Sequence, residues 1–174
     1  MSVVNARAFG LLGSIFMLMD LYLGYLGVGR TGLLALLGLL LVLIGVKEVA
    51  FEANYPKIYR NFLIYFVAMA IFFVTLFFTS NPILLWVLLL IGAVFLMLSF
   101  TSIEAVSGIS MFKYAAWVYL SGAVLFMVFV GLILLPIALS LQAVAFYSLP
   151  DELEQIQGDQ FEENLVLEEP KENF

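Results

Sequence analysis

The chain has 174 residues, of which 64% are hydrophobic and 11% charged, and its mean hydropathy is +1.13. This composition lies far outside that of soluble domains, which excludes an ordinary water-soluble fold. The chain contains neither cysteine nor histidine. That excludes disulfides, cysteine-held iron–sulfur clusters, covalent haem attachment and histidine-ligated haem or zinc, so we expect no cofactor.

The charges are unevenly distributed along the chain. No charged residue lies between Arg60 and Glu104 or between Lys113 and Asp151, while nine of the thirteen acids fall in the last 24 residues. The net charge of −6 therefore comes from the C-terminus. We predict a transmembrane bundle over residues 1–150 and an acidic tail over residues 151–174.

The apolar runs predict the fold class. A hydrocarbon core of about 30 Å needs about 20 apolar residues in a helix, and only helices and closed barrels satisfy the backbone there. The runs show no period-2 alternation, which argues against a barrel. We predict an all-α membrane bundle of about five transmembrane helices, over Ala8–Val28, Thr31–Val46, Asn61–Thr79, Pro82–Phe100 and Tyr114–Leu139.

The first predicted helix follows Arg7, as the apolar region of a signal peptide would. Its apolar run is longer than the 7–15 residues typical of such a region, and no clear cleavage site follows it. We therefore expect a retained transmembrane helix.

Asp20 is the one charged residue deep within a predicted span. A carboxylate at the bilayer centre costs at least about 2.5–3.5 kcal/mol, so an intramembrane acid is a candidate functional site. Asp20 could carry a proton or bind a cation. Alternatively, it is protonated or hydrogen-bonded to Tyr22, Tyr25, a neighbouring helix or a partner subunit.

Glycines are frequent in the first two helices and between them. Gly27–Gly32 fits the pattern G-x-G-x-x-G, but a dinucleotide site would need a βαβ unit, so we predict a tight turn between two helices. Small residues let helix backbones approach closely in lipid. We therefore predict a closely packed helical hairpin at the remaining glycines, which are Gly10, Gly13, Gly24, Gly38 and Gly45.

The loops after the second and third helices carry polar residues. The basic loop from Lys47 to Arg60 could bind anionic headgroups, but we expect a solvated loop. Asn81 and Pro82 predict a helix start, with Asn81 as the N-cap. An enzyme acting on lipid would need converging carboxylates, and the only candidates, Glu48, Glu52 and Glu104, are expected to be loop charges.

The last apolar run reaches Tyr147 and would be about 51 Å long as one helix. That exceeds one span, but two halves would each be too short. We predict one span with a kink at Pro136 and an excess segment, Ile137–Tyr147, that leaves the core or lies in the interface. Such an apolar excess suggests a covering partner.

The tail begins with a helix-start signal at Ser148–Glu152, with acids in the first turn, which predicts a short helix to Gln157 that ends at Gly158. Acids mixed with apolar residues then predict a disordered segment that can dock to a partner. The candidate docking residues are Phe146, Tyr147, Leu153, Ile156, Phe161, Leu165 and Leu167.

Lysine and arginine placement predicts the orientation. With the N-terminus in the cytoplasm, the inner side carries Arg7, Lys47, Lys57, Arg60 and Lys113, and the outer side carries Arg30 and Lys171. Five spans would then put the acidic tail outside the cell.

Several segments resemble a known family. Ser102–Lys113, Val130-Gly131 and Ala145–Pro150, with the earlier blocks Leu43–Lys47 and Ile58–Leu63, resemble an archaeal multi-pass membrane family known only as domain of unknown function 996. The resemblance runs from the first helix to Pro150 and omits the tail. It implies an archaeal membrane protein and supplies no activity and no catalytic residue.

Three functions are weighed. The leading one is a non-catalytic accessory or scaffolding subunit of a larger membrane complex, for which an energy-converting or respiratory assembly is one conceivable host. The alternative is a small transporter or channel that uses Asp20, and a lipid-modifying enzyme has least support. The expected partners are the lipid bilayer and other membrane-protein subunits, and no nucleic acid.

Overall fold

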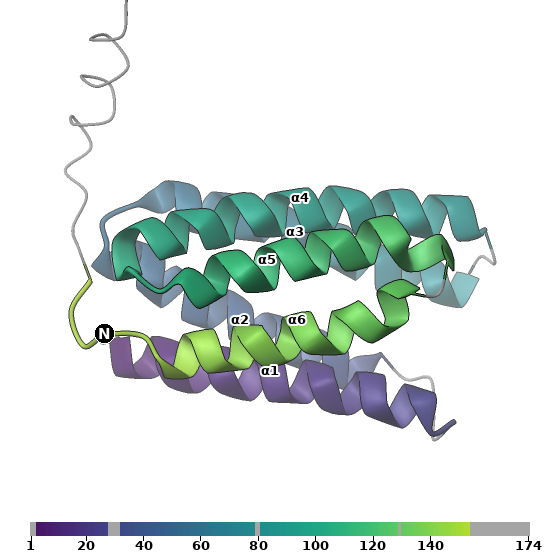
Figure 1. The fold of residues 1–174 in the computed structure, drawn as a ribbon, viewed down its shortest axis with the longest axis horizontal. Coiled ribbons are helices and arrows are strands. Elements are labelled where there is room, and N and C mark those ends of the chain that lie inside the picture. Colours follow the sequence, from purple (N-terminus) through teal and green to yellow (C-terminus); the bar gives the residue numbers. More distant parts are fainter. Residues whose placement is uncertain (1–2, 28–31, 79–80, 129, 154–174) are drawn as a thin grey trace, which may run out of the picture.

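The computed structural model describes residues 3–27, 32–78, 81–128 and 130–153 (Figure 1). These residues form six α-helices and one short 3₁₀ helix, η1. Each α-helix is long and apolar enough to cross a membrane when η1 is counted with α5. The elements are α1 (Val3–Tyr25), α2 (Leu33–Glu52), α3 (Pro56–Phe78), α4 (Pro82–Ser107), α5 (Ser110–Val124), η1 (Leu125–Val128) and α6 (Val130–Tyr147).

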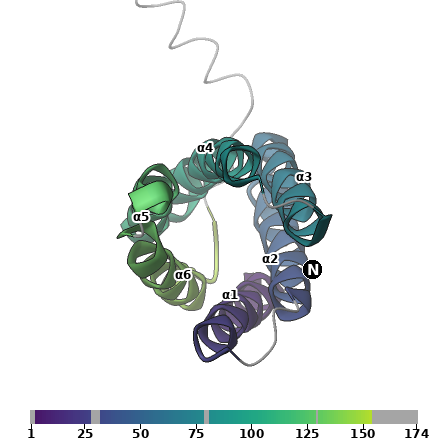
Figure 2. The same cartoon turned by 90° about the vertical axis from the view of Figure 1, so that its right-hand side faces the viewer.

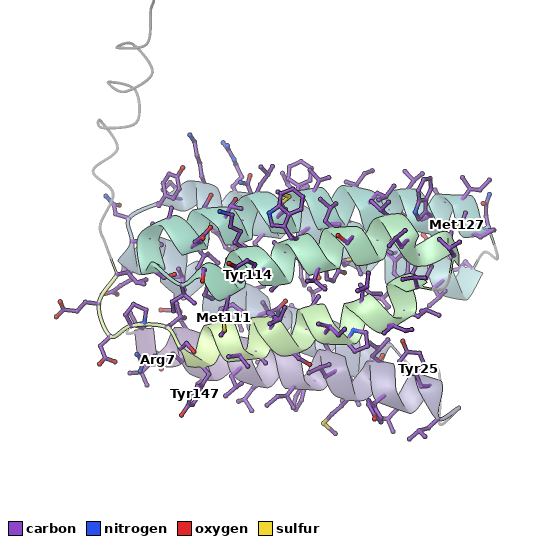
Figure 3. All side chains as sticks on the ribbon, in the orientation of Figure 1. Arg7, Tyr25, Met111, Tyr114, Met127 and Tyr147 are labelled. Atoms are coloured by element: carbon purple, nitrogen blue, oxygen red, sulfur yellow. The ribbon has the colours of Figure 1, made fainter. Side chains whose placement is uncertain are left out.

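The six helices form a closed ring in which neighbours run in opposite directions. Each helix packs against the next one in the chain, and α6 returns to pack against α1 (Figure 2). Val3 and Leu153 consequently lie at the same end of the bundle, which we call the terminal end. Figure 3 places Arg7 and Tyr147 near this terminal end, and Tyr25 and Met127 near the opposite end.

The predicted all-α membrane bundle is confirmed, with six helices where about five were expected. The difference lies in the last apolar run, which divides into α5 and α6 at η1. The first of these helices begins at Ser110, earlier than expected, so Ser110–Val128 supplies 19 residues and Val130–Tyr147 supplies 18. Two halves are therefore long enough, because about 20 residues suffice for a span.

Two glycines let the chain reverse at η1. A Cβ on Gly131 would lie 2.7 Å from the Cα of Phe126, and a Cβ on Gly122 would lie 3.3 Å from the Cβ of Leu134. The bare backbones of α5 and α6 can therefore approach closely beside the turn. The turn residues Leu125–Val128 are all apolar, so composition gave no sign of a reversal.

The segment predicted to leave the core instead packs within the bundle. Ala138, Leu139, Gln142 and Phe146 of α6 are buried. The expectation that Ile137–Tyr147 is an uncovered excess is therefore wrong, since the sixth helix uses this chain to close the ring.

Pro136 lies inside α6 and does not end the helix. Proline has no N–H, so the carbonyl of Leu132, four residues earlier, loses its usual helical partner. The hydroxyl of Tyr25 on α1 donates a hydrogen bond to that carbonyl. In a membrane helix a freed carbonyl needs such a replacement partner, and here it comes from the helix that α6 packs against.

The predicted close packing of the α1–α2 hairpin is confirmed at three of its five glycines. A Cβ on Gly13 would lie 2.7 Å from Val42 Cγ2, and one on Gly38 would lie 2.8 Å from Met17 Cγ. Gly10 packs under the ring of Phe146, and Gly45 lies against the backbone of α1, whereas Gly24 has no atom near its Cβ position. Close approach of α1 and α2 therefore depends on Gly13, Gly38 and Gly45, whereas Gly10 makes room for a side chain of α6.

The helix start predicted at Asn81 and Pro82 is confirmed, and the glycines on either side of the α1–α2 connection have the backbone angles of a turn. The Asn81 side chain accepts hydrogen bonds from the backbone N–H groups of Ile83 and Leu84, at 3.1 and 3.3 Å, with Pro82 at the first helical position. Gly27 and Gly32 have positive φ angles of 72° and 58°, as a turn between α1 and α2 requires. Residues 28–31 lie outside the described residues.

The tail is described only as far as Leu153. Residues 151–153 form a bend and not the first turn of the predicted helix. Arg7 of α1 binds both the Leu149 carbonyl and the Asp151 carboxylate, which holds this segment against α1. The rest of the predicted tail helix, and the segment after it, lie outside the described residues.

The Tyr25–Pro136 pair leads to a prediction about stability. Tyr25→Phe should lower the free energy of unfolding by about 1 kcal/mol, because the Leu132 carbonyl then has no donor. The measurement is thermal or detergent-induced unfolding of the purified protein in micelles.

The matched control is the same change in a Pro136→Ala background. Alanine restores the backbone N–H that pairs with the Leu132 carbonyl, so Tyr25→Phe should then cost much less. An equal cost in both backgrounds would contradict this role for Tyr25.

Candidate functional site

A cavity of about 270 Å³ lies inside the ring. All six helices and η1 contribute to its wall, so it exists only because the ring is closed. The lining residues are Met17, Asp20, Leu21, Ala35, Met69, Phe72, Phe73, Leu76, Leu89, Tyr119, Phe126, Leu132, Leu135 and Leu139.

The cavity lies toward the end of the bundle opposite the termini. Its outer lining comes from the end of α3 and the start of α6, where Leu76 is exposed and Leu132 is half-buried. Its inner lining comes from the middle of the helices, where Met69, Leu89 and Tyr119 are buried. The cavity therefore extends from the opposite end of the bundle to its middle.

Packed aromatic rings occupy the bundle between the cavity and the terminal end. Phe112 and Phe146 meet edge to face with centroids 5.1 Å apart, and Phe100 lies 5.3 Å from Phe112. Edge-to-face pairs at such distances are favourable and leave little space between rings. We call these buried side chains the aromatic cluster, which comprises Phe62, Tyr65, Phe100, Phe112, Tyr119 and Phe146.

Tyr119 belongs both to the aromatic cluster and to the cavity wall. Its hydroxyl accepts a 3.4 Å hydrogen bond from the Tyr65 hydroxyl and donates to the sulfur of Met69 at 3.7 Å. Both tyrosine hydroxyls thus have partners within the protein. A buried hydroxyl without a partner would be costly, so this contact stabilises the inner end of the cavity.

Asp20 is half-buried on the cavity wall, toward the last turns of α1. Among the described residues, none forms a hydrogen bond or an ion pair with its carboxylate. The predicted partners lie elsewhere, since Tyr22 is exposed and the Tyr25 hydroxyl donates to Leu132. The structure therefore places the predicted intramembrane acid at a cavity, which sequence alone did not indicate.

The other described charges lie at or near the terminal end. Arg7 donates through Nε to the Leu149 carbonyl at 2.6 Å and pairs through Nη2 with Asp151 at 2.8 Å. Glu104 pairs with Lys113 at 3.8 Å across the turn between α4 and α5. Within the described ranges, no three acidic side chains gather in a group that could hold a metal ion.

The candidate docking residues separate into three groups. Phe146 is fully buried in the aromatic cluster and Leu153 is buried, so neither can offer its side chain to a partner in this conformation. Tyr147 is 71% exposed and stays a candidate. The remaining four, Ile156, Phe161, Leu165 and Leu167, lie outside the described residues.

Comparison with known proteins agrees with the predicted resemblance. Residues 70–139 match the model of a family described as "Protein of unknown function (DUF996)". The predicted resemblance to this family is confirmed. An uncharacterized protein, MJ1644, from the archaeon Methanocaldococcus jannaschii is 26% identical over 177 residues, which cover 88% of this chain and 96% of that protein. No solved structure matches the chain.

The DUF996 match covers most of the cavity wall. It extends from the second half of α3 through α4 and α5 into α6, and it includes Tyr119 and Leu139. Asp20, on α1, lies outside the matched residues. The family match therefore assigns no role to the carboxylate.

Sequence reasoning missed one buried polar pair between α1 and α6. Gln142 donates through Nε2 to the Ser14 hydroxyl at 2.9 Å, and Ser14 donates to the Gly10 carbonyl at 2.7 Å. Gln142 is the only side-chain amide between Asn81 and Gln155. A lone amide in so apolar a run is a signal for an interhelical hydrogen bond, and it could have identified α6 as a packed helix.

Proposed function

We propose that this multi-pass membrane protein is a non-catalytic accessory or scaffolding subunit of a larger membrane complex. The observation that carries the proposal is how its polar groups are used. Buried side-chain nitrogen and oxygen atoms in the described ranges all have hydrogen-bond partners, and these partners join one helix to another or to its own backbone. Polar groups that are engaged in such hydrogen bonds stabilise the bundle and are not free to act as acids, bases or nucleophiles.

The distribution of charge favours the terminal end as the surface that contacts another subunit. The terminal end carries five described cations and most of the described acids, and the acidic tail of residues 154–174 continues from it in the sequence. An exposed aromatic side chain, Tyr147, lies at the same end. A charged surface with an exposed tyrosine suits contact with another subunit, because aromatic residues are enriched in interfaces. An energy-converting or respiratory complex is a possible host.

Six spans change the orientation expected from five. Both described ends of the chain lie at the terminal end, so a cytoplasmic N-terminus and an extracellular tail cannot hold together. Arg7, Lys47, Lys57, Arg60 and Lys113 all belong to this end. By the positive-inside rule we place the terminal end, with both termini, in the cytoplasm.

The accessory role predicts a stable association with other membrane proteins. The full chain, tagged at its C-terminus and solubilised gently from its native membrane, should migrate well above its monomer mass of 19.4 kDa plus micelle, with defined co-purifying proteins. Truncation after Leu153 should remove at least one of these proteins. The measurement is native gel electrophoresis followed by mass spectrometry of the bands.

A matched control replaces residues 154–174 with a glycine–serine segment of equal length, which keeps the spacing to the tag. This control should lose the same proteins as the truncation. Migration of the full chain alone at monomer mass, with no tail-dependent band, would contradict the accessory role.

The orientation can be tested with single introduced cysteines, because the chain itself contains none. Ser148→Cys near the end of α6 and Ser2→Cys should both resist a membrane-impermeant maleimide in intact cells and react after permeabilisation. Ser80→Cys, between α3 and α4, should react in intact cells. Labelling of Ser148→Cys but not of Ser2→Cys in intact cells would restore the five-span orientation.

The cavity favours a second candidate, a small transporter or channel that uses Asp20. Acids within transmembrane helices often mark substrate or ion pathways, and Asp20 lies on the wall of a cavity that all six helices line. If the protein is a carrier, Asp20→Asn should abolish ion or solute flux into proteoliposomes, whereas the terminal-end control Glu48→Gln should not. Unchanged flux in Asp20→Asn would end this candidate.

A further inference from the structure

We propose that the central cavity is a binding site for a small hydrophobic amine, with the apolar body in the cavity and the ammonium group paired to Asp20. The proposal goes beyond the accessory role. It would deepen the transporter alternative, but equilibrium binding requires no flux and can be tested separately.

The size of the cavity sets the size of the ligand. An apolar cavity of about 150 Å³ in a protein interior can hold benzene. The cavity at Asp20 measures about 270 Å³, so it has room for a compact hydrocarbon body somewhat larger than one ring. Twelve of its fourteen lining residues are apolar, and the exceptions are Asp20 and Tyr119. Such a wall favours a hydrocarbon over a sugar or a nucleotide.

The polar groups of the wall set the charge of the ligand. The Tyr119 hydroxyl is already engaged by Tyr65 and Met69, which leaves the Asp20 carboxylate as the polar group available to a ligand. Every other charged residue in the described ranges lies at or near the terminal end, on the far side of the aromatic cluster. Among the residues that the structure describes, none supplies a cation to Asp20 in this half of the bundle, so an ionised Asp20 would be stabilised by a cationic ligand.

Other ligand classes fit less well. An anion would be repelled by Asp20. A bare Ca²⁺ or Mg²⁺ ion needs about six oxygen ligands, and this wall offers a carboxylate and one engaged hydroxyl. An ammonium group needs only a few acceptors and can also lie against aromatic faces, which Phe72, Phe73 and Phe126 bring to the wall.

The test uses 1-aminoadamantane, a compact hydrocarbon cage with one ammonium group. The full-length protein is placed in nanodiscs, and binding is measured by equilibrium dialysis, with empty nanodiscs subtracted to remove partition into lipid. We expect saturable binding of one molecule per chain. Adamantane-1-carboxylate, with the same cage and the opposite charge, should show no saturable binding.

Variants then assign the binding to the cavity. Asp20→Asn, which preserves the size of the side chain, should weaken 1-aminoadamantane binding at least tenfold. Its binding of the neutral 1-adamantanol should not fall. The matched control Glu48→Gln, which removes a carboxylate near the terminal end, should bind 1-aminoadamantane as the parent does.

A second variant fills the space without touching the charge. Ala35 is buried on the cavity wall, so Ala35→Leu should reduce binding of both the amine and the alcohol. Thermal unfolding of each variant in nanodiscs verifies that it folds. If Ala35→Leu does not fold, Leu135→Ala serves as a further probe. This variant enlarges the cavity and should retain amine binding.

The proposal is overturned by any of three results. These are no saturable binding of the amine above empty nanodiscs, equal binding of the amine and the carboxylate, and amine binding that folded Asp20→Asn leaves unchanged. Failure of amine binding would leave the tail-dependent association untouched, and failure of that association would leave amine binding untouched, so the two proposals can fail independently.

Discussion

The contact between α1 and α6 is the interaction on which the rest of the structure depends. Five helix pairs join neighbours in the chain, but this pair joins the two ends of the sequence and closes the ring. Apolar burial cannot select it, because lipid tails are as apolar as the helix surfaces, so close packing and hydrogen bonds must do so. Those contacts occur at several levels along the seam: Arg7 with Leu149 and Asp151, Gly10 with Phe146, Ser14 with Gln142, and Tyr25 with Leu132. Without this seam the cavity would lose one side of its wall.

The parts of the fold that the sequence could predict are those with a local physical cause. Long apolar runs predict helices because the bilayer leaves the backbone few alternatives, and Asn81 with Pro82 predicts a helix start because both act within one turn. The α5–α6 reversal has no local cause of that kind. It occurs in an entirely apolar segment. The two glycines beside it allow close packing, but only in a structure in which α5 and α6 face each other. The partner of the carbonyl that Pro136 frees also has no local signal, since it is a tyrosine on a helix distant in the sequence.

The candidate site shows the same division between local and distant information. Asp20 could be singled out from sequence because a carboxylate in an apolar run is costly wherever the chain goes. Its cavity could not be predicted, because the wall combines residues from all six helices and exists only in the closed ring. The burial of Phe146, a predicted docking residue, could not be read from the sequence for a related reason. Its ring occupies space that the absent side chain of Gly10, more than a hundred residues earlier, leaves open.

Closing the ring also changes what the charge distribution means. With five spans the apolar excess after Pro136 required a partner, and the bundle itself offered no interior. With six spans the segment after Pro136 completes the bundle as part of α6. The features that favour a partner are then the charged terminal end and the tail. The interior gains a separate property, an apolar cavity with one carboxylate. The aromatic cluster lies between these two regions, so a ligand beside Asp20 and a partner at the terminal end would contact different residues. A binding role inside the bundle and an accessory role at its terminal end are therefore compatible in one molecule, and the packed rings of the aromatic cluster separate the two regions.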